Sequence, residues 1–174
     1  MRIWRSKSLV GLLIGCLQIV LVFADRGPST PDERANAVRL ARLLESDPLG
    51  PDAKEARHWL TMWVIEVPDI HVSLCGILLG PVLDAKKNYA PELITQMMYS
   101  STAFVIEHPD QAADEVSMYV AGVEGSLRAY ESLLKAKPKA RWPYLDDLIQ
   151  KRNQGQLLAY IGAKVPSCNT SDKS

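Results

Sequence analysis

The sequence predicts an all-α fold of about six helices, arranged as stacked helical hairpins or an irregular bundle with one disulfide. Apolar residues recur at helical spacing through most of the chain, and Pro and Gly divide it into segments of helix length. No segment alternates strictly enough to require a strand, although residues 157–161 are ambiguous. With 174 residues, 47% of them hydrophobic and 23% charged, the chain has a globular composition.

The first two helices have the clearest boundaries. Thr30-Pro31-Asp32-Glu33 is a capping box, in which the Thr hydroxyl and the Glu carboxylate satisfy free backbone amides at a helix start. Apolar residues follow at helical spacing until Asp47-Pro48 ends that helix. Pro51 begins a second helix, which ends at Val67-Pro68 because Pro disfavours helical geometry in the residue before it.

The later helices are delimited in the same way by Pro at their starts and by Gly or Pro at their ends. Residues 86–88 are expected to form a loop. The expected helices cover residues 69–79, 91–108 and 110–136, with a last helix from Pro143 onward.

An internal echo supports this division into helices. Val64 to Asp69 recurs in altered form as Val105 to Asp110, displaced by 41 positions. Repeats of this period are typical of helical hairpins that stack on one another. The echo therefore predicts how the helices are arranged and does not predict a catalytic or binding site.

The helix expected over 110–136 has two distinct stripes. One is apolar and consists of Val116, Val120, Val123, Leu127, Tyr130 and Leu134. The other is a ridge of small side chains at steps of four, namely Ala113, Ser117, Ala121, Gly125 and Ala129. Such a ridge lets another helix approach closely. That helix belongs either to the same domain or to a partner protein, which makes Ala121 and Gly125 possible partner contacts.

Residues 1–24 resemble an export signal, which leaves residues 25–174 as a single helical domain. Arg2, Arg5 and Lys7 form a basic start, an apolar run follows, and Ala24 ends a segment suited to cleavage. The leader holds three of the 20 basic residues and none of the 20 acidic ones, so the remaining chain is mildly acidic. The protein is therefore expected to be secreted to the periplasm or the extracellular space.

Two alternative features of the leader would place the protein at a membrane. Leu13-Ile14-Gly15-Cys16 has the form of a lipoprotein box, which would attach a lipid to Cys16. An uncleaved leader would act as an anchor, but its apolar run is shorter than the roughly 20 residues that span a bilayer. Contact with a membrane is expected only in these two cases.

After export, two cysteines remain, Cys75 and Cys168, and an oxidising compartment favours their pairing. The loop between them is long, and its closure is worth about 4 to 5 kcal/mol in the chain-entropy model. We predict a structural disulfide, with residues 165–174 as a flexible tail. The alternative, a nucleophilic cysteine, lacks a recognisable surrounding motif.

The overall charge and the absence of motifs exclude several function classes. Equal numbers of basic and acidic residues argue against general nucleic-acid binding. The sequence contains no phosphate-binding glycine loop, nucleophile elbow or paired Cys motif, so no cofactor, metal or catalytic residue is expected. Glu55 and His58 have the spacing of half a di-iron site, but no second pair exists.

A hydrolase is the catalytic alternative. Its candidate groups lie at the two echoed turns and include carboxylates and imidazoles suited to acid and base roles: Glu66, Asp69, His71, Glu107, His108 and Asp110. This alternative requires the two turns to converge in one cleft.

Residues 135–144 combine cations with aromatic side chains. The members of this segment that could contact a partner are Lys135, Lys137, Lys139, Arg141, Trp142 and Tyr144. Cations at the end of a long helix are favoured by its dipole and can simply remain solvated. The alternative is a patch for an acidic partner, a polyanionic envelope component or the edge of a membrane.

Two family resemblances accompany these patterns. The Leu-Leu-x-x-x-Pro helix ends, with Tyr130 and Pro138, resemble tetratricopeptide repeats, although a period of 41 is longer than theirs. The middle of the chain resembles small exported immunity proteins that neutralise secreted bacterial toxins. This second resemblance rests on Cys75-Gly76, Gly80, Asp84 and His108-Pro109-Asp110, and it lacks the cysteine usual in that family after the following helix.

Together these observations predict an exported, non-catalytic helical protein that binds a partner or acts as a scaffold. The partner is expected to be another protein rather than a nucleic acid. A periplasmic toxin-immunity protein is the sharpest alternative, because that is the function the second resemblance implies. A hydrolase is the other alternative.

Overall fold

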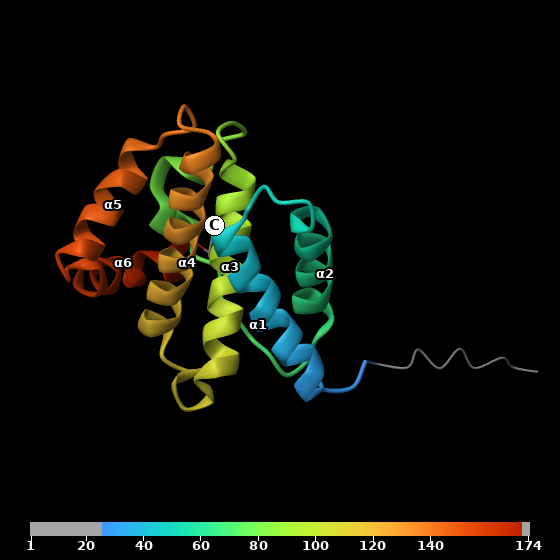
Figure 1. Ribbon diagram of the computed structural model, residues 1–174. Helices are drawn as coiled ribbons and strands as arrows, with labels where there is room; N and C mark the ends of the chain where they lie inside the picture. Colours follow the sequence, from blue (N-terminus) through green and yellow to red (C-terminus); the bar gives the residue numbers. More distant parts are fainter. Residues whose placement is uncertain (1–25, 172–174) are drawn as a thin grey trace, which may run out of the picture.

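The computed structural model describes residues 26–171, and within them the chain is helical with no strand (Figure 1). The predicted leader, including Cys16, lies outside the described residues. The elements are α1 (Pro31–Ser46), α2 (Ala53–Glu66), η1 (Gly76–Val82), α3 (Ala90–Glu107), η2 (Pro109–Gln111), α4 (Glu115–Ala136), α5 (Pro143–Asn153) and α6 (Leu157–Ser171), where η denotes a 3₁₀ helix. The all-α prediction is confirmed.

The helix starts follow the sequence signals closely. Thr30 caps α1, its hydroxyl accepting from the Glu33 amide while the Glu33 carboxylate accepts from the Thr30 amide, so the predicted capping box is present. Proline lies in the first turn of α1, α3 and α5. A fixed φ and the missing N–H are harmless there, because the first amides of a helix have no intrahelical partner.

The antiparallel pair of α3 and α4 forms the centre of the molecule (Figure 1). Its register is visible in two hydrogen bonds, from the Ser126 hydroxyl to the Leu93 carbonyl and from the Ser101 hydroxyl to the Met118 carbonyl. In Figure 1, α1 runs obliquely across this pair with α2 outside it, while α5 and α6 cover the opposite side. One continuous hydrophobic core connects all six α-helices.

Three expected elements differ from the observed ones. Residues 69–75 are not helical, and a 3₁₀ segment begins only at Gly76. Long-range contacts hold both ends of this segment, since the Asp69 carboxylate accepts hydrogen bonds from Ser29 and Cys75 is bridged to Cys168. The long helix begins at Glu115 rather than near residue 110, after η2 and an Asp114 cap. The single helix expected from Pro143 onward is two helices, α5 and α6, and the ambiguous residues 157–161 belong to α6.

The two copies of the internal echo end α2 and α3 in the same way. The amides of Val67 and His108 each bond to the carbonyl four residues earlier. The chain then diverges, extended after α2 and 3₁₀ after α3. The echo therefore corresponds to two similar helix ends followed by different connections.

The predicted disulfide between Cys75 and Cys168 is present, with the two Cα atoms 5.5 Å apart. It joins the start of η1 to the last helix. Residues 165–174 were expected to form a flexible tail. Residues 165–171 instead continue α6 and carry the bridged Cys168. Within residues 26–171, no helix combines the length and apolar character needed to cross a bilayer.

Candidate functional site

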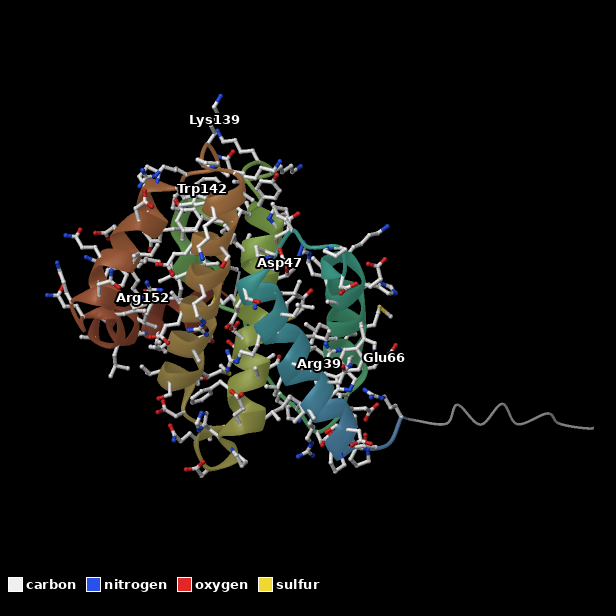
Figure 2. All side chains as sticks on the ribbon, in the orientation of Figure 1. Arg39, Asp47, Glu66, Lys139, Trp142 and Arg152 are labelled. Carbon is white, nitrogen blue, oxygen red and sulfur yellow. A yellow bond between two sulfur atoms is a disulfide. The ribbon has the colours of Figure 1, made fainter. Side chains whose placement is uncertain are left out.

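The most distinctive surface is the end of the bundle where α4 stops and α3 starts. Two loops meet there, because the Trp142 indole N–H donates to the Asn88 carbonyl at 3.1 Å although 54 positions separate the two residues. We call this surface the basic end. It consists of Lys86, Lys87, Lys135, Lys137, Lys139 and Arg141, all of which are exposed. Lys139 projects beyond the helices in Figure 2.

The aromatic residues of the predicted segment support the basic end from below. Trp142 is only 8% exposed, and its amide donates to the Tyr130 hydroxyl at 2.8 Å. Tyr130 is fully buried, and its hydroxyl donates in turn to Asp146. Burial raises the pKa of Tyr130 above its ordinary value, so this phenol stays neutral and keeps its donor. Trp142 is thus a structural residue rather than an exposed contact.

Tyr144 has a similar supporting role. Its ring packs on Gly80, where a β-carbon would lie 2.8 Å from the ring and where φ is +57°. Its hydroxyl lies 3.3 Å from both the Leu78 carbonyl and the Tyr160 hydroxyl. Burial and the neighbouring phenol raise the pKa of Tyr144. Only glycine fits here without strain, since the position needs both positive φ and open space.

The cations of the basic end have few counter-charges. Arg141 pairs with Asp146 at 3.0 Å, and the exposed Asp84 lies near Lys86 in the chain. The other five cations form no ion pair with any described residue. The helix dipole of α4 favours Lys135, which lies in its last turn, but it cannot account for Lys86 and Lys87 on the neighbouring loop.

Lys86 and Lys87 were missed as site residues by the sequence reasoning, which treated them only as loop. Two adjacent cations after a helix stop are a weak signal by themselves. Their proximity to residues 137–142 depends on the Trp142 to Asn88 hydrogen bond, which no local pattern predicts.

The centre of the bundle holds a second group of charges, and these are matched. Glu45 is 6% exposed, and it pairs with Arg42 at 2.7 Å and with Arg128 at 2.8 Å while accepting from the Ser100 hydroxyl. Burial opposes its ionisation, but the hydrogen bonds from Arg128 and Ser100 outweigh burial and hold the pKa of Glu45 below its ordinary value. Arg42 also pairs with Glu107.

Gly125 lies directly against this charged group. A β-carbon at Gly125 would lie 1.8 Å from the Ser100 hydroxyl and 2.9 Å from Glu45. At this point the closely packed neighbour of the small-residue ridge is α3 of the same chain. Ala121, one turn earlier, is partly buried.

The candidate hydrolase groups do not form one constellation. Asp69 is bound by Ser29 and Arg34, and the Ser29 amide and hydroxyl with that guanidinium hold its pKa below the ordinary value. Glu107 pairs with Arg42, and His108 stacks on Phe104 with ring centroids 4.8 Å apart. Glu66 and His71 are exposed. No hydrogen bond joins any two of these groups among the described residues.

Residues 26–171 also contain no group of three or more His, Cys, Asp or Glu side chains arranged to hold a metal ion. No protein-family model matches the chain, and comparison with curated proteins and with solved structures gives no match.

Proposed function

We propose that this protein is an exported, non-catalytic binding protein that recognises an acidic surface of another protein through its basic end. The observation that carries the proposal is the meeting of two cationic loops, which the hydrogen bond from the buried Trp142 indole to the Asn88 carbonyl joins. Five of the six cations are unpaired among the described residues, so a partner would not have to break existing ion pairs.

Electrostatic complementarity of this kind speeds encounter and selects partners of opposite charge. The buried Trp142 links the two loops through its hydrogen bond to Asn88, which holds the lysine backbones of the two loops near one another. Less ordering is then required on binding, because only the side-chain ends must be immobilised.

Export is part of the same proposal and has two supports. The leader has the charge and apolar pattern of an export signal. The Cys75 to Cys168 disulfide is a bond that persists mainly in oxidising compartments.

The direct test is titration of the ¹⁵N-labelled protein with polyglutamate at low salt. We expect the amides of residues 86–88 and 135–142 to shift most. A variant with Lys86, Lys87, Lys137 and Lys139 changed to Gln should bind about tenfold more weakly, because each exposed charge pair contributes a few tenths of a kcal/mol.

A control variant shows whether position matters beyond charge. Arg39 and Lys54 are exposed and lie on α1 and α2, so Arg39→Gln with Lys54→Gln is compared with Lys137→Gln and Lys139→Gln. Only the second pair should weaken binding. Equal losses in both pairs, or amide shifts elsewhere on the molecule, would overturn the proposed site.

A toxin is the second candidate for the acidic partner, and one observation favours it. The residues that carry the immunity-protein resemblance include Gly80, which packs against the ring of Tyr144, two residues after Trp142 in the chain. If a neighbouring gene encodes a secreted toxin, that toxin should bind the wild-type protein and lose affinity for the four-lysine variant. Equal affinity for both proteins would remove the toxin from consideration.

A further inference from the structure

A second surface lies between α1 and α2, remote in sequence from the basic end. Two hollows of about 370 and 280 Å³ open there, and Trp59 lines both of them. Met62, Trp63 and Glu66 line the first, and Leu40, Leu43 and Glu55 line the second. We call the two hollows together the α1/α2 groove. Glu66 and Arg39 mark its neighbourhood in Figure 2.

The floor of the groove consists of two stacked indoles. The Trp59 and Trp63 rings are 5.6 Å apart and inclined by 11°. Trp63 is 4% exposed, and its indole N–H forms no hydrogen bond within the described part of the chain. Trp59 is only partly buried, so it offers aromatic surface to a ligand.

The molecule already holds one cation in this groove. The Arg26 guanidinium lies 5.9 Å from the Trp63 ring centroid and pairs with Glu33. A cation over an indole and beside a carboxylate is a favourable arrangement, because the negative face of the ring and the carboxylate both attract it. The groove can therefore hold a cation over an indole and beside a carboxylate, as Arg26 shows with Trp63 and Glu33.

The part of the groove around Trp59 also combines an indole with carboxylates, and within the described residues no cation lies over the Trp59 ring. Asp52, Glu55 and Glu66 are exposed and form no ion pair with any described residue. Arg39 is the other cation lining the groove, and its guanidinium donates to Asn36. Four carboxylates thus face two cations. Met62 lines the groove and is 43% exposed, and Ile65, three residues later on α2, is 71% exposed.

We infer that the α1/α2 groove binds an extended segment of a partner protein in which arginine or lysine alternates with apolar residues. The cation would lie over Trp59 between the free carboxylates, and the apolar side chains would cover Met62 and Ile65. The charge preference is opposite to that of the basic end, so one molecule could hold two partners of opposite charge.

The test uses two acetylated, amidated heptapeptides, one alternating Leu with Arg and the other alternating Leu with Glu. They are titrated into the ¹⁵N-labelled protein while the indole N–H signals of Trp59 and Trp63 are followed. We expect the arginine peptide to shift the Trp59 signal in a saturable way and the glutamate peptide to leave it unchanged. Equal shifts with both peptides, or none up to millimolar concentration, would overturn the inference.

Two charge-matched variants locate the binding without disturbing the core. Glu55→Gln with Glu66→Gln should weaken binding of the arginine peptide about fivefold. Asp84→Asn with Asp110→Asn removes two exposed carboxylates elsewhere and should leave binding unchanged. Equal losses in the two variants would indicate attraction by net charge alone. Concentration-dependent shifts of the same indole signals without peptide would assign the groove to a second copy of the chain, and both outcomes would contradict the inference.

Discussion

The centre of the bundle and its basic end use charge in opposite ways. In the centre, the buried Glu45 is held by Arg42, Arg128 and Ser100 from three helices. At the basic end, five exposed cations have no ion-pair partner among the described residues. Buried charge must be matched because desolvation is costly, whereas exposed charge can stay unmatched in water. Changes in the centre should therefore alter folding, and changes at the end should alter binding.

Loss of the disulfide should have the largest effect on stability. Changing Cys75 and Cys168 together to Ser should lower the free energy of unfolding by about 5 kcal/mol, because the unfolded chain regains the freedom of a long loop and two buried positions become polar. Urea denaturation of the oxidised protein and the double variant measures this. Equal midpoints would show that the bridge does not stabilise the fold.

Gly125→Ala should destabilise the centre by about 2 kcal/mol, because the new β-carbon meets Ser100 and Glu45 where α4 packs on α3. Gly162→Ala is the matched control in α6, where the nearest atom would be 3.6 Å away. The control should be neutral or more stable by up to about 1 kcal/mol, since Ala favours helix over Gly. Thermal unfolding of both variants compares them, and an unchanged Gly125→Ala variant would refute the tight packing.

Glu45→Gln should cost about 2 kcal/mol, because it leaves Arg42 and Arg128 without their shared buried anion. The cost is below that of a fully buried pair, since the Arg128 side chain is 39% exposed. Glu131→Gln, at the pair with Arg152, is the surface control and should cost less than 1 kcal/mol. Similar costs for both would contradict the special position of Glu45.

Acid should weaken the centre through the same carboxylate. A carboxyl group whose folded-state pKa is lowered stabilises the protein above its unfolded pKa, and this stabilisation is lost as pH falls through the folded value. Glu45, with an ordinary value of 4.5, and Asp69, with one of 3.8, both have lowered pKa values. Stability should therefore fall as pH decreases below 4.5, and less steeply in Glu45→Gln. Denaturation midpoints between pH 2 and 6 measure the two slopes, and equal slopes would oppose this assignment.

Variants of the basic end should change stability least. Lys137→Gln with Lys139→Gln should shift the free energy of unfolding by less than about 0.5 kcal/mol, because both side chains are exposed and unpaired in the described structure. Trp142→Ala is the informative contrast. It removes a buried ring and the hydrogen bond to Asn88, so it should cost about 3 kcal/mol and separate the two loops.

Local signals in the sequence predicted most of the fold. The capping box at Thr30, the prolines in three first turns and the pairing of Cys75 with Cys168 all appear as expected. The expected helix over 69–79 was wrong over residues 69–75, whose two ends are held by Ser29, 40 positions before Asp69, and by Cys168. A long-range hydrogen bond of this kind leaves no mark in local periodicity.

The sites were less predictable than the helices because they too depend on contacts between residues that are far apart in the sequence. The sequence predicted a cationic cluster from Lys135 to Arg141. Lys86 and Lys87 join this cluster only through a contact between loops that are distant in sequence. The buried Glu45 had a usable signal, since it follows Ala41 by four positions on the apolar face of α1. An acidic residue on the apolar face of a predicted helix indicates either that its charge is paired inside the protein or that the wrong face of the helix was predicted to be buried.

The most direct measurement determines unfolding free energy and polyglutamate affinity together for two variants. We predict that the four-lysine variant keeps its stability within about 1 kcal/mol and loses about tenfold in affinity. Glu45→Gln should lose stability and keep its affinity. If the four-lysine variant binds as the wild-type protein does, or if Glu45→Gln loses affinity while folded, the division between a folding centre and a binding end would be contradicted.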